Sequence, residues 1–274
     1  MNISIRKFDM KKIGDEKIVI VLGRRGSGKS IITKDILFHK NYIPAGTVIS
    51  PTENANSFYK KFVPRMFIHH EYDESITRNF MKRQKKMRKL INNGENIDDR
   101  AYLIFDDCLY DNAWKKDKNI LEIFLNGRHW HVFYCLLLQF PLGIAPNLRS
   151  NIDFVFIFRE NVLSNRKRIF DHYAGCFGDF NLFCEVMDQC TQNYECLVID
   201  YTTQSNKLED QIYWYKAEMH PDFRMGPDEI WDYNDANFKE DDDADEEDDI
   251  TNYRKKKGPK LNVKKLDARV DNHD

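Results

Sequence analysis

The stretch IVIVLGRRGSGKS, residues 18–30, joins an apolar run to a glycine-rich loop that ends in Lys29-Ser30. The loop matches the pattern G-x-x-x-x-G-K-[ST], which a strand precedes and a helix follows. Its members are Gly23, Arg24, Arg25, Gly26, Ser27, Gly28, Lys29 and Ser30. Glycines let consecutive backbone N–H groups face one anion, and the start of the next helix favours negative charge. The stretch therefore predicts a nucleoside triphosphate site, with Lys29 on the phosphates and Ser30 on Mg²⁺.

Short apolar runs alternate with segments of helical periodicity along the chain. The expected strands are 17–22, 47–50, 102–105, 132–138, 153–158, 196–201 and 212–215. The expected helices are 30–38, 76–92, 116–126, 165–173 and 180–191. This alternation predicts an α/β fold with a mostly parallel sheet covered by helices on both faces, and with the glycine-rich loop it resembles the P-loop NTPase (ASCE/RecA-like) type. The core is expected at about residues 15–160, and further strands and helices are expected over 161–238.

The bulk composition limits the class of protein. The 274 residues, of which 42% are hydrophobic, are enough for one large domain with additions. The apolar runs are too short to span a bilayer, so we expect a protein that is not integral to a membrane. The six cysteines form no C-x-x-C pair, which favours a reducing, cytosolic-type compartment.

The charges are distributed unevenly. Residues 240–249 hold nine acids, and a lysine- and arginine-rich segment follows them. Neither segment has an apolar period, so residues 239–274 are predicted to be a disordered acidic-then-basic tail after an ATPase domain over 1–238. Without the acidic run, the balance of basic to acidic residues changes from 42 against 44 to 42 against 35. The chain is therefore net positive without that run, and the basic helix expected at 76–92 is either a phosphate-contacting element or a solvated face.

Two further apolar runs end in polar residues that could complete the nucleotide site. Residues 102–105 lead into Asp106 and Asp107, and residues 132–138 lead into Gln139. A carboxylate at the carboxyl end of a parallel strand points into the crevice that holds the phosphates. We expect Asp106 to bind Mg²⁺, Asp107 to act as general base on water, and Gln139 to sense the γ-phosphate or orient the water.

The spacing of these residues favours one class of P-loop protein. In nucleotide and small-molecule kinases, the Mg²⁺-binding strand usually neighbours the P-loop strand. In motor-type ATPases another strand lies between them, and a second acid follows the first. The wide separation of Lys29 from Asp106, the paired acids and the later strand ending in Gln139 favour the motor type.

An arginine could reach the γ-phosphate of a neighbouring subunit and stabilise charge in the transition state. Arg128 follows Asn126-Gly127, a predicted helix stop, and precedes the strand that ends in Gln139. We take Arg128 as the candidate, with Arg149 and Arg159 as alternatives.

The segment from Arg128 to Arg159, together with GRRGSGKS and LIFDD, resembles the FtsK/HerA superfamily of DNA-pumping ATPases. Within it, these features are most similar to the poxvirus-type genome-packaging ATPases of nucleocytoplasmic large DNA viruses. The resemblance covers about residues 15–215. Asp107 stands where cellular relatives more often have glutamate, whose side chain is longer.

The resemblance implies an ATP- and Mg²⁺-dependent ring of subunits, a pentamer or hexamer, that moves double-stranded DNA into a capsid. It implies Asp107, Gln139 and Arg128 as catalytic residues, and Ser30 and Asp106 as Mg²⁺ ligands. Capsid or inner-membrane proteins are further candidate partners, and the host cytoplasm at the assembly site, or the virion, is the expected location. Two alternatives stay open: a nucleotide or small-molecule kinase, and a non-catalytic, nucleotide-dependent assembly factor. A preference for adenine or guanine does not follow from the residues.

Overall fold

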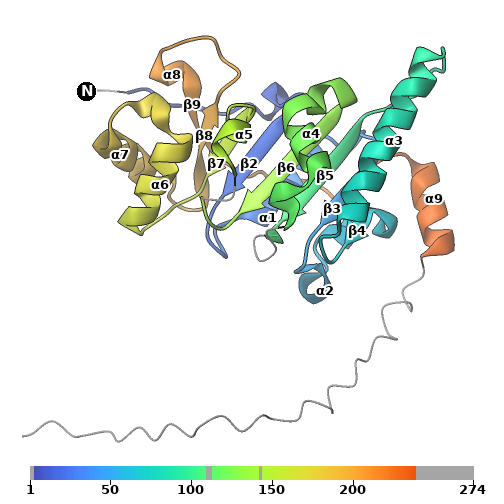
Figure 1. The fold of residues 1–274 in the computed structure, drawn as a ribbon. Helices are drawn as coiled ribbons and strands as arrows, with labels where there is room; N and C mark the ends of the chain where they lie inside the picture. Colours follow the sequence, from blue (N-terminus) through green and yellow to red (C-terminus); the bar gives the residue numbers. More distant parts are fainter. Residues whose placement is uncertain (1–2, 109–112, 142–143, 239–274) are drawn as a thin grey trace, which may run out of the picture. The chain divides into compact units, whose positions relative to one another are not determined.

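The computed structural model describes residues 3–108, 113–141 and 144–238, and a twisted β-sheet forms its centre (Figure 1). The strands are β1 (Arg6–Lys7), β2 (Ile18–Leu22), β3 (Ala45–Ile49), β4 (Ile68–His69), β5 (Ala101–Asp106), β6 (Val132–Leu138), β7 (Phe154–Ile157), β8 (Glu195–Asp200) and β9 (Ile212–Lys216). Across the sheet they run in the order β1-β9-β8-β7-β2-β6-β5-β3-β4.

The strand directions confirm the predicted fold class. β8 is antiparallel to β7 and β9, and every other neighbouring pair in the described sheet is parallel. β6 lies between β2 and β5, which is the order expected for a motor-type ATPase. The carboxyl ends of β2, β6 and β5 therefore meet at one edge of the sheet.

Helices cover both faces of the sheet, because the strands alternate apolar side chains between two cores. Ile18, Ile20 and Leu22 of β2 belong to one core, and Val19 and Val21 belong to the other. The first core is shared with α3 (Glu74–Asn92), α4 (Lys118–Asn126), α5 (Pro146–Arg149), α6 (Leu163–Tyr173) and α7 (Phe180–Cys190). The second is shared with α1 (Lys29–Phe38) and the 3₁₀ turn Tyr59–Lys61. In Figure 1, α3 and α4 lie in front of the sheet and α1 lies behind it.

The helix N-termini differ in whether a side chain caps them. The N-cap side chains of Asp73, Asp117 and Asp179 accept backbone N–H bonds at the starts of α3, α4 and α7. The N-cap of α1 is Gly28, which has φ of 109° and no side chain to cap the helix. The first N–H groups of α1 are therefore left for a ligand.

Several elements differ from the sequence-based expectation. The predicted helix 116–126 begins at Lys118, because Asp117 caps it instead of joining it. β1, β4, α2 (Glu53–Asn56), α8 (Leu208–Gln211) and α9 (Asp228–Asn237) had no predicted counterpart. Among the described residues, no helix has the length and apolar character that crossing a membrane requires. The predicted tail at 239–274 lies outside the described residues, so the division at 238 stays a prediction.

Candidate nucleotide-binding site

The glycine-rich loop connects β2 to α1 in a conformation that its glycines permit. Gly26 and Gly28 have positive φ values of 75° and 109°, which L side chains rarely adopt. At Gly23 the restriction is steric, since a Cβ atom there would lie 2.4 Å from Ser27 Oγ and 2.9 Å from Phe158 Cβ. The Ser27 Oγ atom is buried and has no hydrogen-bond partner among the described residues. The loop is thus a compact turn with polar groups available to an anion.

Lys29 begins α1 and lies under the loop. Its side chain is buried, and its Nζ atom donates to the carbonyl oxygen of Arg24 at 3.3 Å. The same Nζ lies 3.9 Å from Asp107 Oδ1, at the edge of ion-pair distance. Burial lowers the pKa of Lys29, while the charges of Asp107 and Asp106 raise it. Lys29 is therefore a buried cation already placed beside the two predicted acids.

Asp106 ends β5 and is 5% exposed. Its Oδ2 atom accepts a hydrogen bond of 2.9 Å from the hydroxyl of Tyr59. Burial and the neighbouring Asp107 raise the pKa of Asp106 to about 6, and the Tyr59 hydrogen bond and Lys29 act in the opposite direction. A buried carboxylate that resists ionisation is stabilised by a bound cation, so the donor set of Asp106 with the Ser30 hydroxyl fits Mg²⁺.

Asp107 and Gln139 meet across the tips of β5 and β6. Gln139 Nε2 donates to Asp107 Oδ2, and Asp107 has a φ of 56° in the left-handed region. The Asp107 Oδ1 atom is buried and accepts no hydrogen bond among the described residues. Backbone strain at a polar residue is common at functional sites. The arrangement leaves one carboxylate oxygen, beside Lys29, available to a bound water or ion.

The three candidate arginines lie in different surroundings. Arg128 is exposed in the 3₁₀ turn Gly127–Trp130, before β6 begins, and its side chain makes no ion pair or hydrogen bond within the described residues. Arg149 ends α5 and lies 6.0 Å from the ring centroid of Tyr173. Arg159 follows β7 and pairs with Asp188 at 3.4 Å. The structure thus brings Lys29, Asp106, Asp107 and Gln139 together and keeps Arg128 at the opposite end of β6.

The sequence did not indicate two residues that support the acids. Glu53 is buried, and its carboxylate accepts backbone N–H bonds from Phe58, Tyr59 and Lys60. These bonds fix the turn that carries Tyr59 against Asp106. Tyr59 stands 47 positions before Asp106, and no local pattern links them.

Tyr194 is a third residue that the sequence did not indicate. Its Cδ1 atom lies 3.8 Å from the position that a Cβ of Gly28 would take, so the ring adjoins the loop. The side chain is 70% exposed, and Asn193 and Tyr194 both have positive φ values. An exposed aromatic face held in this way beside a phosphate loop is a candidate surface for a nucleobase.

Replacement of Tyr59 with phenylalanine tests the support of Asp106. The phenyl ring keeps the buried volume but removes the hydroxyl that lowers the pKa of Asp106. Removing such an outer hydrogen bond typically costs about 10–100-fold in metal affinity. We therefore expect nucleotide-dependent Mg²⁺ affinity to fall by about 10-fold or more, with nucleotide binding in chelator unchanged. Tyr42→Phe, at a surface tyrosine, is the control, and equal Mg²⁺ affinity in all three proteins would contradict the assignment.

The fold and the site together define a P-loop NTPase with a strand inserted between the P-loop strand and the acidic strand. The chain belongs to the poxvirus A32 protein family, whose model matches residues 5–206. The family resemblance drawn from the sequence is thereby confirmed.

Related chains and solved structures agree with this assignment. An uncharacterized protein of Acanthamoeba polyphaga mimivirus is 38% identical over 218 residues, or 78% of this chain and 77% of the relative. One from invertebrate iridescent virus 6 is 39% identical over 242 residues, or 87% of this chain and 92% of the relative. The genome packaging NTPase B204 of Sulfolobus turreted icosahedral virus 2, in complex with ATP-gammaS, matches with a TM-score of 0.55 and 18% identity. That match covers 76% of this chain and all of the other, and it establishes a shared fold.

Proposed function

We propose that this protein is an ATPase that moves double-stranded DNA and packages a viral genome into its capsid. One observation carries the ATPase part of the proposal: Lys29, Asp107 and Gln139 meet at the tips of three adjacent strands. A loop that only holds a nucleotide needs no carboxylate beside the lysine, and no amide to orient that carboxylate. Hydrolysis uses such groups, a carboxylate to accept a proton from the water and an amide to position it.

The residues divide the chemistry among them. The backbone of the loop and Lys29 bind the phosphates, and Ser30 and Asp106 would hold Mg²⁺, which would supply positive charge to the phosphates. Asp107 accepts a proton from the attacking water, and Gln139 orients Asp107 and the water. The packaging NTPase B204, which has a similar fold, has been solved with ATP-gammaS and with AMPPCP, which supports ATP as the nucleotide.

The strand order argues against the kinase alternative. A kinase usually has its Mg²⁺-binding strand beside the P-loop strand, whereas β6 separates β5 from β2 here. An assembly factor that binds nucleotide without turnover would need neither the Asp107–Gln139 contact nor the charge of Asp107. Both alternatives predict no stimulation by DNA.

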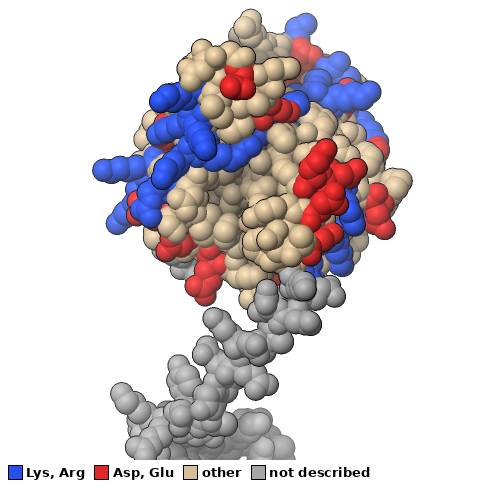
Figure 2. All heavy atoms as spheres, turned by 90° about the vertical axis from the view of Figure 1, so that its right-hand side faces the viewer, with Lys and Arg blue, Asp and Glu red and all other residues tan. Residues whose placement is uncertain are grey.

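The DNA-binding part of the proposal is supported by α3. Figure 2 shows lysine and arginine side chains gathered on one side of the molecular face that carries this helix. The exposed basic residues of α3 are Arg78, Lys82, Lys85, Lys86 and Lys89. Lys85 pairs with Glu122 at 2.9 Å, whereas Lys82, Lys86 and Lys89 make no ion pair among the described residues. Such a surface suits sequence-independent contact with phosphates.

The assembly and location follow from the same proposal. A DNA motor of this kind acts as a ring, a pentamer or hexamer, in which one subunit contributes Arg128 to the next. It works in the host cytoplasm at the assembly site, where it binds the capsid or an inner-membrane protein.

Measuring ATP hydrolysis with and without long double-stranded DNA tests the proposal. We expect DNA to stimulate hydrolysis by the parent and Lys29→Ala to abolish hydrolysis. A Lys82→Ala/Lys86→Ala/Lys89→Ala variant should bind DNA more weakly, and its salt slope should fall by about one for each phosphate that a lysine no longer neutralises. Basal hydrolysis without DNA should stay at the parent level.

The control carries three lysine replacements away from α3, at Lys11, Lys207 and Lys216, which are all exposed. It removes the same charge, so it separates a general electrostatic effect from a local one. Equal stimulation of the α3 variant and this control would place the DNA elsewhere. If DNA does not change the rate of ATP hydrolysis by the parent, the proposed motor function is wrong. Transfer of phosphate to a small acceptor would establish a kinase.

A further inference from the structure

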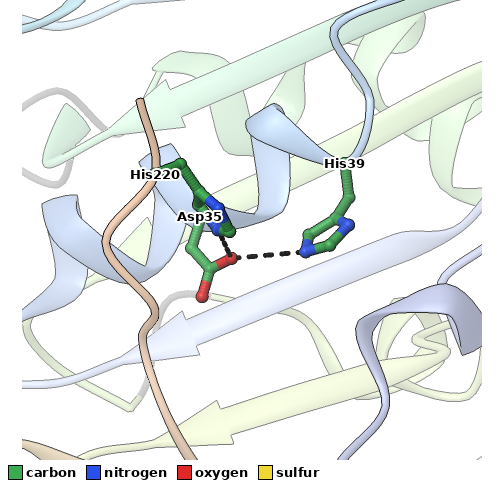
Figure 3. Close-up of side chains that lie close together, drawn as sticks. All are labelled: Asp35, His39 and His220. Carbon is green, nitrogen blue, oxygen red and sulfur yellow. Dashed lines mark hydrogen bonds and ion pairs between the residues drawn. The ribbon is translucent and has the colours of Figure 1, made fainter. Parts of the chain in front are cut away.

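A second cluster of ligand-type side chains lies away from the nucleotide site, toward the other end of the P-loop helix. Asp35 and His39 are at the C-terminal end of α1, and His220 comes from the segment after β9 (Figure 3). Asp35 Oδ1 lies 2.7 Å from His220 Nε2 and 3.5 Å from His39 Nε2. One oxygen and two imidazole nitrogens lie within 4.8 Å of one another.

Hydrogen bonds to one oxygen of the Asp35 carboxylate fix its orientation, so that the other oxygen faces the cluster. Its side chain is fully buried, and Oδ2 accepts 2.8 Å hydrogen bonds from the Tyr215 hydroxyl and the Glu218 backbone N–H. Oδ1 is thereby turned toward the two histidines. Metal-binding carboxylates are typically fixed by such outer hydrogen bonds on the oxygen that does not bind the ion.

The imidazoles are fixed as well. The ring of His220 stacks on Phe38, with centroids 3.8 Å apart and planes 5° apart. His39 follows α1 as its C-cap residue and is 30% exposed, so one side of the cluster is open to solvent. A water molecule can reach the cluster from that side.

Hydrogen bonding alone does not account for His39. The His220 contact already satisfies Asp35 Oδ1 at 2.7 Å, whereas His39 Nε2 is aimed at the same oxygen from 3.5 Å, too far for a good hydrogen bond. Ligand atoms around a tetrahedral Zn²⁺ lie about 3.3 Å apart, given metal–ligand distances of about 2.0–2.1 Å. The 3.5 Å contact already has about that length, and the 2.7 Å contact has to widen by about 0.6 Å.

We propose that Asp35, His39 and His220 bind one divalent transition-metal ion, for which Zn²⁺ is the best fit. Two imidazole nitrogens and one carboxylate oxygen form an N,N,O set that suits such ions, with water as the fourth ligand. Both histidines bind as neutral rings with the proton on Nδ1, so any proton on Nε2 leaves for solvent. The bound ion links the segment after β9 to the C-terminal end of α1.

Metal titration of the full chain tests the site independently of any ATPase activity. After chelator treatment and dialysis, Zn²⁺ is added against a chromophoric competitor, and X-ray absorption identifies the ligand atoms. We expect one equivalent bound through nitrogen and oxygen donors, and a higher Tm with Zn²⁺ than without it. His39→Gln and His220→Gln should lose that equivalent and the rise in Tm.

His129→Gln is the matched control, because His129 is an exposed histidine in a turn before β6. Should His220→Gln fail to fold, His39→Gln decides, since His39 is partly exposed at a helix end. The proposal is overturned if the parent binds no stoichiometric Zn²⁺, or if His39→Gln keeps the bound equivalent. Sulfur ligands in the absorption spectrum would overturn it too, by assigning the ion to Cys176 or Cys184, which are partly exposed.

Discussion

Replacing Asp107 with asparagine is expected to lower the rate of ATP hydrolysis by about 10²–10⁴-fold while nucleotide binding stays intact. Asparagine keeps the shape of the side chain, and its carbonyl oxygen can still accept the hydrogen bond from Gln139 Nε2. It cannot take a proton from water. The loop and Lys29, which bind the phosphates, are unchanged, and one negative charge is removed beside them.

Single-turnover hydrolysis and equilibrium binding of a fluorescent ATP analogue separate the two effects. Asp171→Asn is the control, since Asp171 is a surface residue of α6 that pairs with Lys167 at 2.8 Å. Parent-like hydrolysis by Asp107→Asn would show that another group accepts the proton. Loss of binding together with hydrolysis would instead give Asp107 a role in holding the nucleotide.

Much of the fold was predictable because its strands are short, apolar and bounded by polar residues. The runs ending at Leu22, Phe105 and Leu138 are all buried on both faces, so each is apolar throughout. Such runs are easily identified as strands from a sequence. The order of these three strands followed from the separation of the motifs, because a strand late in the chain was available to insert between the other two.

The two short strands at the ends of the sheet, β1 and β4, depend on the strand beside them. β1 has two residues and pairs with β9, more than 200 positions later, and neither residue has an apolar signal. β4 also has two residues and exists because β3 offers it a neighbour. Strands this short carry no periodicity, so tertiary contact alone defines them.

The same limit applies to the candidate site. The proximity of Lys29, Asp106, Asp107 and Gln139 was predictable because each lies at or after the carboxyl end of a strand that faces the same crevice. Tyr59 was not, because its hydroxyl reaches Asp106 from a turn that a buried carboxylate holds in place. The contact between Asp35 and His220 joins residues 185 positions apart and could be found only in the folded chain.

Replacing Arg128 with alanine is expected to lower DNA-stimulated hydrolysis by about 10³–10⁵-fold, the effect of losing an arginine finger. Arg128 cannot reach the γ-phosphate that is bound by its own subunit. Arg128 precedes β6 and Gln139 follows it, and the seven residues of that strand span about 20 Å. Arg159, by contrast, lines a small pocket with Gly23, Arg24 and Gln139. Its side chain forms an ion pair with Asp188. Arg159→Ala and Arg149→Ala are therefore expected to have smaller effects.

Mixing inactive subunits distinguishes action on a neighbour from structural damage. An Arg128→Ala subunit keeps its nucleotide site, and a Lys29→Ala subunit keeps its arginine. In a ring assembled from equal amounts, about a quarter of the interfaces pair an intact site with an intact arginine. Activity should then recover, although each variant alone is inactive. Full activity of Arg128→Ala alone would make Arg128 the wrong residue, and an inactive Arg128→Ala with no recovery at any ratio would indicate structural damage. Recovery would mean that each site is completed by the subunit beside it, because Arg128 lies a full strand length from its own Gln139.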